Sequence, residues 1–176
     1  MFLVPMNLPG VTVKPIRQLT GDDEFCEVFF DAVRLPPSAL VGPLDDGWRA
    51  AMSTLAHERA AAMLLAMRTR ADVRHTVGSA GPELPPGRRD EALQLYVESE
   101  VLGLLAERSI AEIGSGTVGP AQSVVKLAWS QVDQRYAEFL FDLHGAAATA
   151  GLRPAAANAL LFSRSSTIAA GTTEVM

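Results

Sequence analysis

The chain has 176 residues, of which 48% are hydrophobic, and it carries a formal net charge of −5 at pH 7. This length fits one domain, or one domain with part of another, and supplies enough apolar residues for a core. The lysines and arginines are scattered along the chain, which argues against nucleic acid or an anionic membrane surface as a partner. The sequence contains no run of about 18 apolar residues, so we expect no membrane span. The first residues lack the order of a secretory signal, so we expect a cytoplasmic protein.

Thiolate and histidine patterns give no support for a metal site. Cys26 is the single cysteine, so neither an intrachain disulfide nor a pair of thiolate ligands can form. His57 and Glu58 begin like a zinc-protease motif, but that motif needs a second histidine four residues after the first. Position 61 is Ala61, so we predict no metal site.

Residues 1–43 have the pattern of a β segment. Short apolar runs at 2–4, 11–14 and 25–33 are separated by turn-forming residues. Three strands are few for an independent sheet, because two or three strands with an uncovered face are marginally stable in water. We therefore expect a partial antiparallel sheet, with apolar side chains left exposed at Val28, Phe29 and Phe30.

Residues 44–176 have the pattern of a helical domain. Apolar residues recur at helical spacing in four segments, and Gly-rich or Pro-rich stretches separate them. Asp45 or Asp46 can cap the first helix, and Asp90 can cap the second. The sequence therefore predicts a mainly α protein, in which a partial antiparallel β segment (1–43) precedes an up-and-down four-helix bundle (44–176). The expected helices span residues 46–77, 90–113, 120–144 and 155–168.

The first of these helices contains an unusual charge. Five of its apolar residues share one helical face, at about 100° per residue. Arg59 falls in the middle of this apolar arc, and Glu58 lies at its edge. A charge there must be paired, hydrated or bound to a ligand, because desolvating it alone costs several kcal/mol. A structural ion pair or a snorkelling arginine explains it as well as a ligand does. The five apolar residues are Trp48, Met52, Leu55, Ala62 and Met63.

Several short motifs occur in an order that resembles a known enzyme family. Together they resemble an acyl-CoA dehydrogenase, from the later part of the middle β domain (1–43) through the C-terminal helical domain (44–176). Each motif is weak alone, but the ordered set covers essentially the whole chain. The motifs are Phe2-Leu3-Val4-Pro5, Pro9-Gly10-Val11, the run from Glu27 to Pro36, Gly47-Trp48, Leu55-x-x-Glu58-Arg59 and Ile168-Ala169-Ala170-Gly171-Thr172-Thr173-Glu174.

The resemblance implies a reaction and roles for particular residues. Family members transfer a hydride from an acyl-CoA to FAD after a carboxylate removes the α-proton, and they form a trans-2-enoyl-CoA. Many carry that carboxylate immediately before the Gly-Thr, where this chain has Ala170. A smaller group carries it on the first bundle helix, which implies Glu58 as the base and Arg59 as a substrate-side residue. Gly171 and Thr172 match the Gly-Thr that approaches the flavin.

The sequence also departs from the family pattern. It has only a vague match to an arginine motif at the end of the first helix, and Asp142 and His144 lie in a run that in relatives carries a Gln before Gly-Gly. The N-terminal helical domain and the first half of the β domain have no counterpart. The resemblance therefore implies a piece of an enzyme with little activity alone. It would act with copies of itself or with a complementary N-terminal half or partner subunit, and with an electron-transfer acceptor protein. The alternative is a non-catalytic helical bundle that serves as an oligomerisation or partner subunit.

Overall fold

The computed structural model describes residues 1–80, 83–115 and 120–174, and for residues 56–60 it describes the backbone alone. The chain forms two compact units, Met1–His57 and Glu58–Met176. Helix α1 (Gly47–Ala80) runs through the point at which they divide. The domain boundary between residues 43 and 44 stays a prediction.

The first unit contains a two-stranded antiparallel sheet of β1 (Val11–Ile16) and β2 (Phe25–Phe30). Val11 pairs with Phe30 at one end of the ladder. The predicted third strand forms only an isolated bridge between Phe2 and Leu40. Strand β2 ends before the predicted residue 33, because Ala32 adopts a positive φ of 50° that an extended strand does not allow.

The apolar side chains of β2 lie exposed, as the sequence predicts. Val28, Phe29 and Phe30 are all solvent-accessible, and every residue of β2 is exposed. Two strands cannot bury a face against each other, so these side chains have no core to enter. A 3-10 helix, η1 (Pro37–Ala39), follows the sheet.

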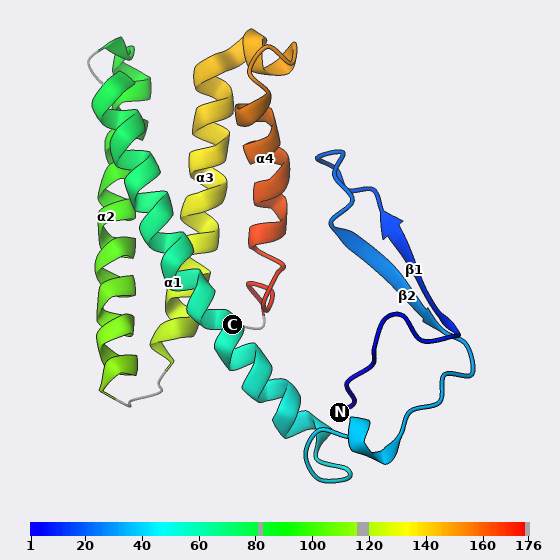
Figure 1. The fold of residues 1–176 in the computed structure, drawn as a ribbon. Helices are drawn as coiled ribbons and strands as arrows, with labels where there is room; N and C mark the ends of the chain where they lie inside the picture. Colours follow the sequence, from blue (N-terminus) through cyan, green and yellow to red (C-terminus); the bar gives the residue numbers. More distant parts are fainter. Residues whose placement is uncertain (81–82, 116–119, 175–176) are drawn as a thin grey trace. The chain divides into compact units, whose positions relative to one another are not determined.

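The second unit is an up-and-down helical bundle, which confirms the predicted fold class (Figure 1). Successive helices run in opposite directions, from α1 through α2 (Pro86–Gly114) and α3 (Ala121–Thr149) to α4 (Pro154–Ser166). None of the described helices is long and apolar enough to cross a membrane.

Two predicted helix ends are corrected by the structure. Helix α2 begins at Pro86, so Asp90 lies inside the helix and does not cap it. Pro85 has an extended backbone, and Pro86 takes the first helical position. The N–H that proline lacks would have no partner within the helix at this position. Helix α3 continues past the predicted stop at Gly145, but Gly145 has φ 49° and ψ −127° and breaks the regular helix there.

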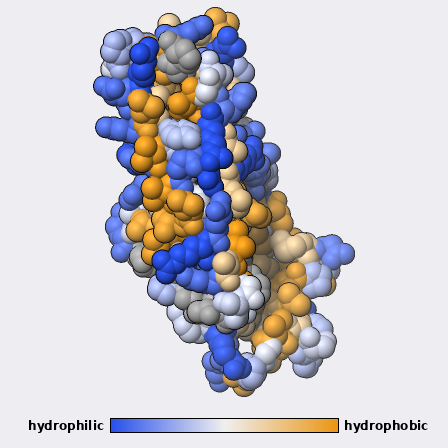
Figure 2. Space-filling view, turned by 90° about the vertical axis from the view of Figure 1, so that its left-hand side faces the viewer, coloured by the Kyte–Doolittle hydropathy of each residue, from blue (hydrophilic) through white to orange (hydrophobic). Residues whose placement is uncertain are grey.

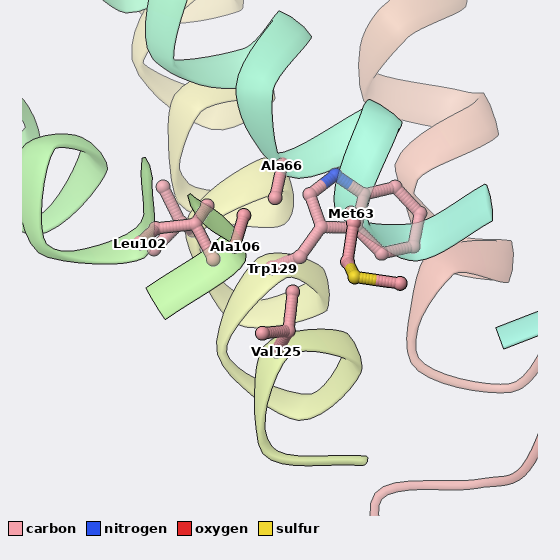
Figure 3. Packing of buried hydrophobic residues seen from close by; sticks show 7 residues of the cluster. Met63, Ala66, Leu102, Ala106, Val125 and Trp129 are labelled. Atoms are coloured by element: carbon pink, nitrogen blue, oxygen red, sulfur yellow. The ribbon is translucent and has the colours of Figure 1, made fainter. Parts of the chain in front are cut away.

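The apolar face predicted for α1 is buried only along its later part. Trp48 is 78% exposed and Leu55 is 39% exposed, whereas Ala62 and Met63 are buried. Figure 3 shows Met63 close to Trp129 of α3 in the core of the bundle. This core cluster comprises Met63, Ala66, Leu102, Ala106, Val125, Trp129 and Val132.

A second core cluster fills the other end of the bundle. It comprises Val73, Leu84, Ala92, Leu95 and Phe139. Two hydrogen bonds connect α1 to α3 beside the clusters. Trp129 Nε1 donates to Thr69 Oγ1 at 3.1 Å, and the hydroxyls of Tyr136 and Thr76 lie 2.8 Å apart. These bonds satisfy polar atoms of large side chains that the core would otherwise leave unpaired.

Candidate functional site

The segment after α4 carries the two residues predicted to contact a cofactor. Ala170 has φ 55° and Gly171 has φ 109°, so the chain turns sharply at this point. Gly171 and Thr172 are half-buried. The N–H of Thr173 donates to Thr167 O at 3.1 Å and closes the turn. We refer to residues 168–174 as the Gly-Thr loop.

Hydrogen bonds within this loop stabilise a negative charge at its end. The pKa of the Glu174 carboxyl is lowered, first by a backbone hydrogen bond at Glu174 itself and then by the Thr172 side chain. The nearby Lys126 ammonium also lowers this pKa. The Thr172 side chain and the Glu174 carboxyl therefore lie close together in the loop.

A buried lysine of α3 holds the loop from the other side. Lys126 is only 1% exposed, and it is one of the largest fully buried side chains among the described residues. Its Nζ donates to Gly171 O at 2.5 Å. Burial lowers the pKa of Lys126, while the Glu174 charge opposes that shift. A buried ammonium is costly unless it is paired, so this contact with the loop compensates a real desolvation cost.

Other polar side chains of α3 hold the last turn of α4. Ser166 Oγ donates to Asp133 Oδ2 at 2.7 Å. Gln134 Nε2 donates to Ser163 O and to Thr167 Oγ1, both at 3.1 Å. Burial raises the pKa of Asp133, with the Ser166 hydrogen bond acting against the shift. One side of α3 therefore fixes both the end of α4 and the loop that follows it.

A groove of about 320 Å³ lies on the bundle beside these contacts. Side chains of α1, α3 and α4 line it, and most of them are apolar or aromatic. Its polar members include Asp72 and Asp133. The principal apolar lining residues are Leu65, Trp129, Tyr136, Leu140 and Phe162.

The predicted catalytic pair lies in α1, on a turn whose side chains are outside the described residues. The backbone of Glu58 and Arg59 is helical, as the sequence predicts. Their roles as base and substrate-side residue stay predictions. The cofactor-binding roles of Gly171 and Thr172 also stay predictions, although both residues have a defined setting in the loop.

Two residues at positions of family motifs are engaged elsewhere. The Arg74 guanidinium pairs with Glu100 of α2, where Arg70 also binds. Asp142 pairs with Arg88 at 2.9 Å. Among the residues that the structure describes, no group of His, Cys, Asp and Glu side chains could hold a metal ion.

Lys126 is the site residue that sequence reasoning missed. It lies in the run Val124-Val125-Lys126, within the segment predicted as the third helix, and the sequence pattern predicts no role for it. One signal was available in the sequence, because Lys126 is next to Val125 and three residues before Trp129, within an otherwise apolar run from Val124 to Trp129. A lone cation among core positions needs a partner, and its partner is a backbone carbonyl distant in sequence.

Comparisons with known proteins agree with this architecture. Residues 45–176 match the model of the acyl-CoA dehydrogenase C-terminal domain. The chain is 35% identical to acyl-CoA dehydrogenase IpdE1 of Mycolicibacterium smegmatis over 99% of its length, which is 45% of that relative. It is also 35% identical to acyl-CoA dehydrogenase FadE34 of Mycobacterium tuberculosis, over 99% of this chain and 24% of that relative. The chain thus spans less than half the length of both relatives.

Solved structures share the fold at low sequence identity. The Tcur3481-Tcur3483 steroid ACAD matches with a TM-score of 0.83 and 21% identity, over 99% of this chain and 48% of that one. An acyl-CoA dehydrogenase from Geobacillus kaustophilus matches with a TM-score of 0.84 and 20% identity, over 98% and 48%. The family match over most of the chain and the 35% identical relatives carry the assignment. This chain belongs to the acyl-CoA dehydrogenase family.

Proposed function

We propose that the chain supplies the helical-bundle half of an FAD-dependent acyl-CoA dehydrogenase. The reaction removes a proton from the α-carbon and a hydride from the β-carbon of an acyl-CoA thioester, which yields a trans-2-enoyl-CoA. The observation that supports this proposal is the family match from residue 45 to residue 176, which includes both the Glu58-Arg59 pair and the Gly-Thr loop.

In this proposal Glu58 is the base. Its carboxylate accepts the α-proton of the thioester. The more common position for the base, immediately before the Gly-Thr, is Ala170 here and has no group that can take a proton. A carboxylate at the edge of an apolar helix face can reach a substrate and still be desolvated enough for its pKa to rise. Arg59 follows it and serves the substrate side, near the CoA moiety.

The Gly-Thr loop is suited to contact a flat cofactor. Gly171 has no Cβ and adopts φ 109°, so a planar ring can approach its backbone closely. The half-buried Thr172 supplies a hydroxyl next to it. FAD, when bound, supplies the hydride acceptor. The chain's own residues orient the thioester and hold the proton taken from the α-carbon.

We further propose that the active form is assembled from more than this chain. The two relatives are each more than twice as long as the part that this chain matches. A complementary N-terminal half, a second copy of the chain and an electron-transfer acceptor protein are the proposed partners.

The test is whether the purified chain carries flavin and acts on acyl-CoA. The proposal predicts flavin absorbance in the purified protein, alone or in complex with a complementary chain, and bleaching of that absorbance when acyl-CoA is added. Formation of enoyl-CoA is the second readout. Flavin that stays oxidised with every acyl-CoA tested would count against the proposed reaction.

The alternative function is a non-catalytic bundle that serves as an oligomerisation or partner subunit. One observation favours it. Helix α2 exposes a row of apolar side chains spaced three or four residues apart, which therefore share one face. Figure 2, which views the molecule from the side of α2, shows hydrophobic residues gathered in a band along the bundle. A colourless protein that forms a stable oligomer would support this alternative. The row comprises Leu93, Val97, Val101 and Leu104.

A further inference from the structure

The Gly-Thr loop has few backbone hydrogen bonds among the described residues. The N–H groups of Ile168 and Ala169 donate to Ser165 O at the end of α4, and Thr173 N donates to Thr167 O, so no backbone hydrogen bond is made by the N–H of Ala170 or Gly171 in that set. Ala170 adopts φ 55°, which is an uncommon conformation for a residue with a Cβ and costs energy. A loop with such a backbone persists only when contacts from its surroundings stabilise it.

The contact that meets this need comes from the ammonium of Lys126. We infer that Lys126 is a positioning residue, which holds Gly171 and Thr172 in the conformation in which they meet the cofactor. Its Nζ donates to Gly171 O at 2.5 Å across 45 residues of sequence. The inference rests on the proposed function in one respect, because it takes the Gly-Thr loop as the cofactor contact.

The chemistry of the contact favours this role. A hydrogen bond from a charged donor is about twice as strong as a neutral one, and burial removes the competition from water. Lys126 is 1% exposed, so its ammonium cannot exchange this partner for bulk solvent. The Glu174 charge, three residues after Gly171, attracts the same ammonium. The lysine therefore acts on both ends of the segment 171–174.

The end of α4, from which the loop continues, has its own contacts with α3. Gln134 binds Ser163 O and Thr167 Oγ1, and Asp133 binds Ser166, so the end of α4 is held independently of the lysine. Removal of the Lys126 ammonium should consequently free the loop and leave α4 in place. A change confined to the loop is the signature that separates positioning from general support of the core.

The first experiment is hydrogen exchange on the whole chain with Lys126→Met, which keeps the volume of the side chain and removes the charge. We expect exchange of the Thr173 amide to accelerate at least tenfold, while amides within α3 and α4 keep their wild-type rates. Ser130→Ala is the matched control. Ser130 is buried on α3, but its Oγ donates to Leu127 O of its own helix.

Chemical rescue then tests the ammonium itself. Lys126→Cys is prepared together with Cys26→Ser, so that residue 126 carries the one thiol. Aminoethylation in denaturant followed by refolding restores an ammonium at nearly the original length. We expect the treated protein to recover slow exchange at Thr173, whereas the Cys26→Ser protein given the same treatment is unchanged. Loop exchange that stays fast after rescue would overturn the inference.

Flavin binding supplies the second readout. We expect Lys126→Met to weaken FAD binding at least tenfold, with the Ser130→Ala control within twofold of wild type. Unchanged loop exchange in Lys126→Met overturns the inference, and so does a freed loop with unchanged flavin affinity. If the wild-type chain binds no flavin, either alone or in complex with a complementary chain, the proposed function fails, while the exchange and rescue results still decide whether Lys126 positions the loop.

Discussion

Arg70 crosses directly over Gly103 of the neighbouring helix. A Cβ added at Gly103 would lie 2.3 Å from Cδ of Arg70 and 2.6 Å from its Nη1. This passage lets Arg70 reach Glu100 at 2.8 Å on one side and Glu107 at 2.7 Å on the other. The absence of a side chain at Gly103 therefore permits the main polar contact between α1 and α2.

Gly103→Ala is expected to destabilise the protein by about 1–3 kcal/mol, the usual cost of forcing extra atoms into a packed site. The new methyl group displaces Arg70 and weakens both of its ion pairs. The measurement is the free energy of unfolding in urea. Gly78→Ala is the control, because no atom lies within 4 Å of a Cβ at that helical position. A Gly103→Ala protein as stable as the control would contradict the predicted clash.

The Glu100 carboxylate should make the free energy of unfolding depend on pH in the acidic range. The hydrogen bonds from Arg74 and then Arg70 lower the pKa of Glu100 from 4.5 to about 2. Because the folded pKa lies below the unfolded one, the contribution is fully present above pH 4.5 and is lost as the pH falls toward 2. Glu100→Gln should flatten this part of the stability curve. A slope between pH 4.5 and 2 that is identical in wild type and variant would refute the assignment.

Asp133 should change the free energy of unfolding with pH in the opposite direction to Glu100. Burial raises its pKa above the ordinary 3.8, so its charged form is disfavoured in the folded protein. The resulting penalty grows as the pH rises above 3.8, and it is fully present once the pH exceeds the folded pKa. Asp133→Asn removes the charge and keeps an acceptor for Ser166. We expect its melting temperature to exceed that of wild type at pH 7, with a smaller difference near pH 4. Asp90→Asn, at an exposed position on α2, is the control.

The apolar row on α2 should mediate association. Val97 and Leu104 are each 59% exposed, and exposed apolar patches of several hundred Å² are typical of interaction sites. The double variant Val97→Glu with Leu104→Glu should run at monomer mass in size-exclusion chromatography. The wild type and the control Gln94→Glu, which adds a charge beside the row, should run as oligomers. Wild-type protein at monomer mass across the accessible concentrations would contradict this prediction.

The helices were predictable because their periodicity is local. The spacing of apolar residues gave four helices in the right order, and α1 and α4 end within three residues of their predicted limits. Rules for helix starts could not place the beginning of α2. A helix with Pro86 at its first position satisfies them as well as a helix capped by Asp90. The prediction of a third strand was wrong because residues 2–4 form only an isolated bridge, with Phe2 opposite Leu40 and Leu3 N bonded to Ala39 O. β-propensity does not reveal such a partner.

The candidate site was predictable only in part. The motif with Gly171 and Thr172 is contiguous, so sequence alone can find it. The Lys126 contact joins α3 to a loop 45 residues later, and such a pairing follows from the packing of the bundle rather than from any local pattern. The same holds for Arg70, whose route past Gly103 depends on how closely two helices approach.

Whether Glu58 is the base is decided by the rate of flavin reduction by acyl-CoA in the flavin-loaded Glu58→Gln protein. Glu83→Gln, at an exposed position between α1 and α2, is the matched control. We predict that Glu58→Gln lowers this rate by a factor of about 10²–10⁴, as expected when a general base is removed, and that the control reacts at a rate close to wild type. A loss of less than about tenfold at Glu58 would contradict this prediction, because proton abstraction would then depend on another group.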